Sequence, residues 1–253
     1  KPLYINLTHQ EQVVAGNDVQ FVCDVFGANP PADVKWFKGN NLITNETLIQ
    51  TFPEAMPIIT KVTENPDGTF NTKSELQFKA TRFDDNAQFQ CYAENSVTRN
   101  QFDPSFNRQG QLQVKYPPVV TVAPANITRN ETTPKDVIIQ CEFVGNPLEM
   151  ITVYWMKDGK NLTLIPNKHI GGTKASPLLT IKNVTRHDMG DYTCVCMNAV
   201  GVSVSENSAY LNVNYPPTVE VIMDPPHPVK SVNGINVTAV CNVVSGNPPT
   251  LTK

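Results

Sequence analysis

Apolar and polar residues alternate in short stretches of the chain, a pattern that predicts β-strands. Residues 22–26, 74–78 and 111–114 show it in whole or in part, as expected for strands with one buried face. The Asn-Pro-Asp-Gly segment at 65–68 lies between two such stretches, and its proline and glycine favour a tight turn. No stretch has the spacing of a convincing amphipathic helix. The pattern therefore predicts an all-β fold.

The chain repeats itself with a period close to one hundred residues. Cys23 and Cys141 are each followed by a glycine and an Asn-Pro pair, and a tryptophan lies 13 residues after the first cysteine and 14 after the second. Tyr-Pro-Pro occurs at 116–118 and again at 215–217, 99 residues later. That spacing is about the length of one β-sandwich domain. We therefore divide the chain into a first repeat (1–116), a second repeat (117–215) and a third repeat (216–253).

Charge and hydropathy narrow the class of protein. The chain has 20 Lys and Arg against 23 Asp and Glu, a net charge of −3. This balance argues against a nucleic-acid-binding or membrane-surface protein, because both usually carry a basic face. No apolar run approaches the about 18 residues that a membrane span needs, and the first residues carry no signal-peptide pattern. We expect no nucleic acid among the partners.

Cysteines and glycosylation sequons indicate the compartment. None of the six cysteines forms a Cys-x-x-Cys pair or has a histidine at metal-ligand spacing, so disulfides are favoured over zinc. Seven Asn-x-Ser/Thr sequons predict N-linked glycans. Their asparagines are Asn6, Asn45, Asn126, Asn130, Asn161, Asn183 and Asn236. The chain is therefore predicted to be extracellular.

The second repeat carries the most complete motif. Trp155 follows Cys141, and the segment from Asp188 to Cys194 reads Asp-Met-Gly-Asp-Tyr-Thr-Cys. This Cys…Trp…Asp-x-Gly-x-Tyr-x-Cys pattern resembles the immunoglobulin superfamily. The resemblance implies tandem immunoglobulin-like β-sandwiches. The third repeat has 38 residues and lacks both the tryptophan and a second cysteine, so we interpret it as the start of a truncated domain in a longer ectodomain.

The resemblance also implies roles for individual residues. Cys23 would pair with Cys91, and Cys141 with Cys194, as the disulfide between the two sheets of each sandwich. Each bond would contribute roughly 4 kcal/mol in the chain-entropy model. Tyr192, two residues before the second cysteine, would form the tyrosine corner.

The first repeat departs from the family motif in two places. Counting back from Cys91 aligns Asp85 with the motif aspartate, Ala87 with the glycine and Phe89 with the corner tyrosine. Phe89 has no hydroxyl group, so we expect its ring to pack in the core without the corner hydrogen bond.

Two cysteines remain. Cys196 lies two residues beyond Cys194, hence on the same inward side of a strand, and Ala93 holds the matching place in the first repeat. We expect Cys196 to be a buried free thiol that packs as a small hydrophobe; an intermolecular bridge is the alternative. Cys241 is expected to pair with a cysteine beyond residue 253.

No group of residues suggests chemistry. The four histidines are scattered, and the sequence has no Gly-x-Ser-x-Gly, His-Glu-x-x-His or phosphate-binding loop. Acidic residues lack calcium-loop spacing. We expect neither an enzyme nor a bound cofactor or metal.

Alternation around the inward-pointing Trp36 and Cys91 predicts an outward face on the first repeat. Its residues are Phe37, Gln88, Gln90, Tyr92, Gln111 and Gln113. Aromatic and amide side chains with few charges are typical of an interface core, so we predict partner binding there. In the second repeat the same reasoning exposes Tyr154, Met156, Val195 and Met197. The alternative is that some of these pack against a neighbouring strand or domain.

Two observations refine the predicted surface. A long loop at 95–110, with Phe102 and Phe106, is a further contact candidate. No sequon falls within 88–115 or 188–215, as expected if contact faces stay free of bulky glycans.

These patterns predict a cell-surface adhesion or recognition receptor, similar to nephrin-like, echinoid-like or sidestep-like proteins. The implied partner is another immunoglobulin-superfamily cell-surface protein, either a second copy or a different protein. We expect the chain on the extracellular side of the cell membrane, with a transmembrane segment beyond residue 253. The alternatives are the ligand-binding ectodomain of a receptor kinase or phosphatase and a secreted immune-defence protein.

Overall fold

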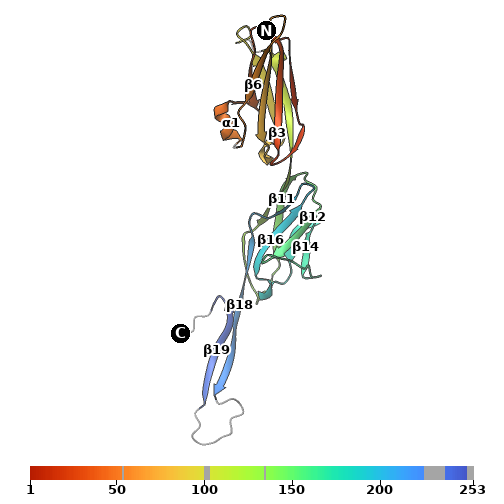
Figure 1. Ribbon diagram of the computed structural model, residues 1–253. Coiled ribbons are helices and arrows are strands. Elements are labelled where there is room, and N and C mark those ends of the chain that lie inside the picture. The colour runs from red at the N-terminus through yellow and green to blue at the C-terminus, as the bar shows by residue number, and fades with distance from the viewer. Residues whose placement is uncertain (53, 100–102, 134, 225–236, 250–253) are drawn as a thin grey trace. The chain divides into compact units, whose positions relative to one another are not determined.

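The computed structural model describes residues 1–52, 54–99, 103–133, 135–224 and 237–249. The chain divides into two compact units, Lys1–Tyr116 and Pro117–Lys253. Strands make up most of both units (Figure 1), and the described residues include one short α-helix. The predicted all-β class is confirmed.

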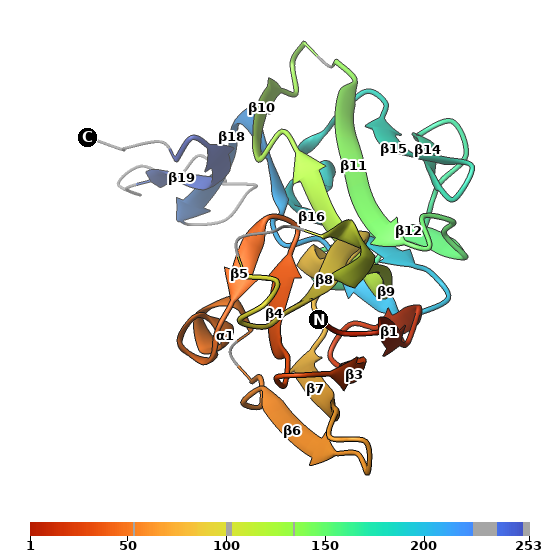
Figure 2. The same cartoon turned by 90° about the horizontal axis from the view of Figure 1, so that it is seen from above.

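The first unit is a sandwich of two sheets. Its strands are β1 (Tyr4–His9), β2 (Gln12–Val14), β3 (Asp18–Ala28), β4 (Asp33–Lys38), β5 (Asn41–Ile43), β6 (Ile59–Glu64), β7 (Phe70–Lys79), β8 (Ala87–Glu94) and β9 (Asn107–Ala123). One sheet has the order β1-β3-β7-β6, and Figure 2 shows β6 at the margin of the unit. The other has the order β9-β8-β4-β5, with β2 parallel to β9. The last part of β9 belongs to the second unit.

Aromatic rings fill much of the first core. Alternate residues of β3 are buried, because successive side chains of a strand point to opposite sides. Phe21 lies with its ring centroid 4.6 Å from that of Phe89, and Phe89 lies 5.2 Å from Phe78. Phe52 stacks on Phe78 at 4.0 Å. As expected, Phe89 keeps the packing role of the missing tyrosine.

The sequence pattern did not predict the one α-helix that the described residues contain. α1 (Asn45–Thr51) begins after Thr44, whose side-chain oxygen accepts a hydrogen bond from the backbone N–H of Thr47 at 3.3 Å. The Thr47 hydroxyl in turn accepts from the Thr44 backbone at 2.9 Å, and Leu48 is buried. Two turns are too short to show a helical period. Threonine also replaces the glutamate or glutamine that marks a capping box in sequence.

The second unit is a similar sandwich with a strand pair attached. Its strands are β10 (Asn126–Asn130), β11 (Val137–Asn146), β12 (Thr152–Lys157), β13 (Lys160–Asn161), β14 (His169–Thr173), β15 (Ser176–Ile181), β16 (Gly190–Met197), β17 (Val202–Val204), β18 (Ala209–Asp224) and β19 (Thr238–Asn247). One sheet has the order β14-β15-β11-β9. The other has the order β10-β18-β16-β12-β13, with β17 also paired to β16. The far part of β18 pairs with β19.

A disulfide lies in each core. Cys23 is bonded to Cys91 and Cys141 to Cys194, with Cα separations of 6.3 and 6.0 Å. The cross-strand neighbours of Cys91 and Cys194 are the two buried tryptophans, Trp36 and Trp155. In the second unit the Tyr192 hydroxyl donates to the Asp188 carbonyl at 2.7 Å, and burial raises the pKa of that hydroxyl.

The turns before β8 and β16 correct the sequence alignment of the two repeats. They contain the 3-10 turns η1 (Arg82–Asp84) and η3 (Arg186–Asp188). Asp84, rather than Asp85, is the counterpart of Asp188: both are buried and both accept from the threonine that precedes the turn. Asp84 pairs with Lys38 and Asp188 with Lys168.

The first repeat therefore has one extra residue between this aspartate and its cysteine. The turn accommodates the extra residue at Asn86, whose φ of 61° is a left-handed conformation that asparagine tolerates. At the corresponding turn of the second unit the residue with positive φ is Gly190, at 146°, where a Cβ atom would come within 2.6 Å of the Asp158 carboxylate. Ala87 begins β8 just as Gly190 begins β16, and their cross-strand neighbours are Leu112 and Leu211, so alanine does stand at the glycine position of the first unit.

Candidate recognition surface

The six residues predicted to bind a partner lie on one side of one sheet. Phe37 is the cross-strand neighbour of Gln90, and Gln88 that of Gln111. None of the six is buried, and Gln88, Gln111 and Gln113 are exposed. Sheet pairing adds Lys35 and Asn107 beside Tyr92, and Leu42 and Gln109 at the ends of the row through Phe37 and Gln90. We call these ten residues the glutamine face.

Hydrogen bonds orient several amides of the glutamine face. Gln90 donates to the carbonyl of Gly39 at 3.3 Å, and Gln111 to the carbonyl of Asn86 at 3.3 Å. Gln12 of β2 donates to the Gln113 oxygen at 3.0 Å. A primary amide has two donors and two acceptor lone pairs, so each side chain keeps capacity for a partner while its position is already set.

Charges gather at one end of this face, which the sequence did not reveal. Lys35 lies 2.7 Å from the largely buried carboxylate of Glu94. Arg99 bridges Glu94 at 3.7 Å and Asp33 at 3.1 Å. The two positive and the two negative side chains of this group balance, so the net charge at this end of the face is zero.

The loop beside the face is shorter than predicted. β9 begins at Asn107, because residues 107–110 pair with β8. Phe106 ends the 3-10 turn η2 (Pro104–Phe106) and is buried, so it is part of the core and not a surface contact. Phe102 lies outside the described residues.

Comparison with known families agrees with this geometry. The sequence profile of the immunoglobulin domain matches residues 2–95 and 117–198. The chain belongs to the immunoglobulin superfamily.

Its relatives include proteins named for adhesion. Cell adhesion molecule 2 of Xenopus tropicalis is 31% identical over 202 residues, which cover 79% of this chain and 41% of the relative. Protein sidekick of Drosophila melanogaster is 30% identical over 231 residues, covering 91% of this chain and 9% of the relative. The chain thus spans less than half the length of these curated relatives. The mouse nectin-like molecule 4 ectodomain is 20% identical, has a TM-score of 0.55 and covers 84% of this chain and 65% of that chain, a likeness of fold.

The matching sheet of the second immunoglobulin unit has a different outer face. Tyr154, Val195 and Val204 are neighbours across three strands, and Met197 pairs with Val202. With Met156 these residues form what we call the valine face. β17, which supplies Val202 and Val204, was not predicted. Val195 was expected to be exposed but is 1% accessible, because side chains on both flanking strands lie beside it.

The six sequon asparagines in the described residues are all exposed. Asn6 is on β1, in the sheet opposite the glutamine face, and Asn45 begins α1 two residues after β5. Asn183 lies in a turn with a φ of 45°. Asn236 lies outside the described residues. No sequon lies on β2, β4, β5, β8 or the part of β9 in the first unit.

Three sequons border the valine face. Asn126 and Asn130 lie on β10, which pairs in parallel with β18, opposite Tyr210 and Asn214. They point outward because Ile127 between them is buried. Asn161 is the cross-strand neighbour of Met156 at the other edge of the sheet. The absence of sequons within 188–215 suggested that this face was free of glycans. Strand pairing nevertheless brings three sequons from other parts of the chain to its edges.

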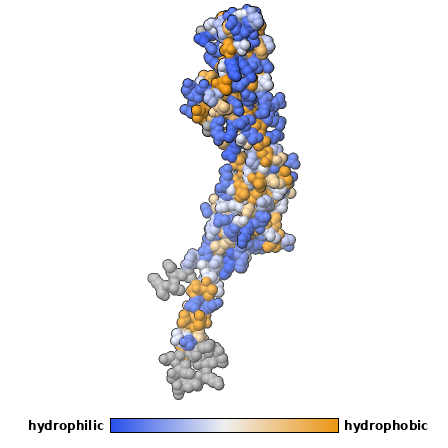
Figure 3. Space-filling model, viewed as in Figure 1, coloured by the Kyte–Doolittle hydropathy of each residue, from blue (hydrophilic) through white to orange (hydrophobic). Residues whose placement is uncertain are grey.

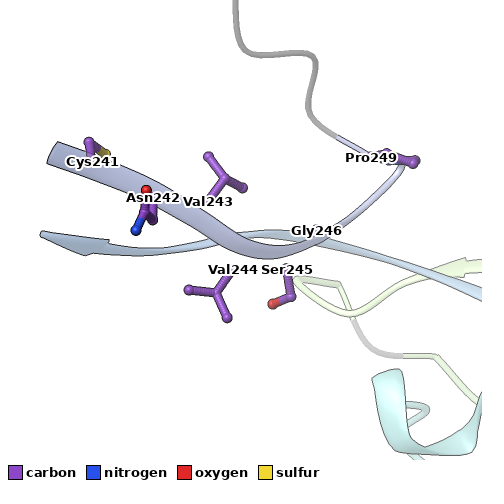
Figure 4. A pocket seen from close by; sticks show the side chains of 7 residues that line it. All are labelled: Cys241, Asn242, Val243, Val244, Ser245, Gly246 and Pro249. Atoms are coloured by element: carbon purple, nitrogen blue, oxygen red, sulfur yellow. The ribbon is translucent and has the colours of Figure 1, made fainter. Parts of the chain in front are cut away.

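The β18–β19 pair exposes apolar side chains. Figure 3 shows hydrophobic residues at its surface. The exposed valines of the pair include Val219, Val221 and Val240. Figure 4 shows the hollow along β19 with Cys241 at one end and Val243 and Val244 on opposite sides of the strand. Cys241 is exposed and has no disulfide partner within the described residues. No helix in the ranges that the structure describes is long and apolar enough to cross a membrane.

Proposed function

We propose that the chain mediates cell–cell adhesion or recognition, at the extracellular side of the membrane, by binding another immunoglobulin-superfamily protein through the glutamine face. The observation that carries the proposal is the face itself. It combines Phe37 and Tyr92 with oriented amides, and its single charged residue, Lys35, is paired with Glu94. No sequon lies on the strands that form it. Aromatic enrichment and charge depletion are typical of interface cores. The adhesion proteins among its relatives support the same function.

Preorganisation strengthens this proposal. Ordering a flexible side chain at an interface costs about 0.5–1.5 kcal/mol. Gln90, Gln111 and Gln113 already accept or donate hydrogen bonds within the unit, so less ordering accompanies binding. Phe37 and Tyr92 provide apolar area from neighbouring strands.

Tyr92→Ala tests the proposal. Aromatic hot spots contribute about 2 kcal/mol or more, so we expect binding to weaken at least tenfold. Tyr154→Ala, at the corresponding strand surface of the second unit, is the matched control and should leave binding unchanged. Cell aggregation and surface plasmon resonance measure the effect, and thermal melts verify folding. Unchanged binding by folded Tyr92→Ala protein would exclude this anchor.

Mixing cells separates self-recognition from recognition of a different protein. Two differently labelled populations, one expressing the chain and one lacking it, are combined. Mixed aggregates mean a different partner on the second population, and aggregates of expressing cells alone mean binding between copies.

A further inference from the structure

Three sulfur atoms, and not two, meet in the second immunoglobulin core. The free Cys196 Sγ lies 3.8 Å from the Cys141 Sγ and 4.0 Å from the Cys194 Sγ, and all three lie within 4.8 Å of one another. Cys194 and Cys196 are both fully buried. They share the inward side of β16 because they are two residues apart.

We propose that Cys196 is a second disulfide partner for Cys141, so that the bond between the sheets of this unit can be held at either of two levels of β16. The Cys196 thiolate attacks the Cys141 sulfur, the Cys141–Cys196 bond forms, and the Cys141–Cys194 bond breaks. Cys194 leaves as a thiolate and takes up the proton that Cys196 released. One disulfide and one thiol are present before and after, so no oxidant or reductant is needed.

Only one direction of attack keeps the two sheets linked. Attack on Cys141 exchanges one residue of β16 for another. Attack on Cys194 would join two residues of the same strand and release Cys141. The loop closed by the bond changes from 53 residues to 196 − 141 = 55, so the two isomers have almost the same loop-closure entropy. Local packing therefore decides between them.

The two isomers differ at the tryptophan. Cys194 is the cross-strand neighbour of Trp155, and Cys196 that of Val153. Exchange moves the bond from the level of the tryptophan to that of the valine and leaves a thiol beside Trp155. Val195, between the two cysteines, is on the opposite side of β16 and belongs to the valine face. The disulfide isomer therefore determines whether β16, the strand that carries Val195, is bonded to the other sheet at Cys194 or at Cys196.

Burial slows the exchange in the folded protein. Desolvation raises the pKa of the Cys196 thiol to about 11, and the thiolate is the attacking species. Below that pKa the thiolate fraction rises tenfold per pH unit. We therefore expect the initial exchange rate of the wild-type chain to rise about tenfold between pH 8 and pH 9.

Differential alkylation tests the proposal on the full chain. Free thiols are blocked with N-ethylmaleimide in denaturant, disulfides are reduced, and the released thiols are labelled with iodoacetamide. Trypsin leaves Cys194 and Cys196 in one peptide, since no lysine or arginine separates them, so fragment ions that divide the peptide at Val195 locate each label. In Cys194→Ala we expect both Cys141 and Cys196 to carry iodoacetamide. N-ethylmaleimide on both would overturn the proposal.

The first unit supplies the matched control. Ala93 stands where the second unit has Cys196, so Cys91→Ala should leave Cys23 free. Cys91→Ala with Ala93→Cys should restore a bond to Cys23. If Cys194→Ala is not secreted, the wild-type chain decides: maleimide that moves onto Cys194 after incubation at pH 9 supports exchange, and maleimide on Cys196 alone rejects it.

Discussion

The glutamine face and the valine face lie on equivalent sheets of the two immunoglobulin units, yet their side chains differ in chemistry. In the first unit, the row through Phe37 and Gln90 ends at Leu42 on one side and at Gln109 on the other. In the second, Tyr154 and Val204 lie on either side of the buried Val195. Sequons border the second sheet at both edges and are missing from the strands of the first. The backbone therefore fixes where a face lies, while side chains and glycans decide what can reach it.

A glycan placed on the glutamine face should have the largest effect. Gln111→Asn with Gln113→Thr creates an Asn-Leu-Thr sequon whose outer residues point outward, while Leu112 stays buried. A bulky glycan there prevents close approach of a partner, so we expect no detectable adhesion. Cell aggregation and the mobility shift after deglycosylation measure the two effects.

The control is the same sequon on the opposite sheet. Glu75→Asn with Gln77→Thr surrounds the buried Leu76 of β7 with the same motif and should preserve adhesion. Full adhesion by the glycosylated β9 variant would shift the site to another surface. Asn126→Gln, Asn130→Gln and Asn161→Gln together ask the reciprocal question, because stronger adhesion after their removal would assign binding to the valine face.

Alternation predicted which side of each strand faces outward but not which strands lie side by side. Phe37 and Tyr92 could be assigned from their distances to Trp36 and Cys91 along the strands. The proximity of Asn126 to β18 could not, because parallel pairing of β10 joins residues far apart in sequence. The burial of Val195 also depends on both neighbouring strands. Sheet order is tertiary information that the period of one strand does not contain.

The second-largest effect concerns the extra residue before β8. Asp84 accepts from the Thr81 backbone and hydroxyl at 2.7 Å each and pairs with Lys38. Asp84→Ala removes all three contacts, so we expect a loss of about 3 kcal/mol in the free energy of unfolding. Asp85 accepts from the Val114 backbone at 2.9 Å, and Asp85→Ala should cost about 1 kcal/mol.

Each unit has its own tryptophan to report this difference. In a Trp155→Phe background, Trp36 fluorescence follows urea unfolding of the first unit. Asp188→Ala, measured through Trp155 in a Trp36→Phe background, should match Asp84→Ala. An equal or larger loss in Asp85→Ala would restore the alignment counted back from Cys91.

A smaller effect is expected where the two cores differ by one methyl group. Gly110 is the neighbour of Phe89, just as Ala209 is the neighbour of Tyr192. A Cβ atom at Gly110 would overlap the His9 ring, so Gly110→Ala should cost about 2 kcal/mol. His9→Ala should relieve the overlap in the double variant. If the losses in the free energy of unfolding of Gly110→Ala and His9→Ala simply add in the double variant, the two sites are not coupled. The His9 ring then moves aside without cost, and the overlap does not explain the loss.

The smallest effect is a pH dependence carried by His9 in the first unit and His169 in the second. Burial lowers the pKa of both imidazoles below the usual 6.5. The His9 Nε2 is buried without a hydrogen-bond partner among the described residues. The His169 Nδ1 accepts from the Ile165 backbone at 3.0 Å, which a protonated ring could no longer do.

The sign follows from proton linkage. As pH falls through about 6.5, the unfolded chain binds protons that the folded histidines still exclude, so the free energy of unfolding decreases. The decrease ends below the folded-state pKa, where both states are protonated. His9→Gln should flatten the profile reported by Trp36, and His169→Gln that reported by Trp155. Urea unfolding between pH 5 and 8 measures both slopes. A profile through Trp36 that keeps its slope in His9→Gln would assign the pH dependence to the carboxylates of the first unit and not to the histidine that packs against Gly110.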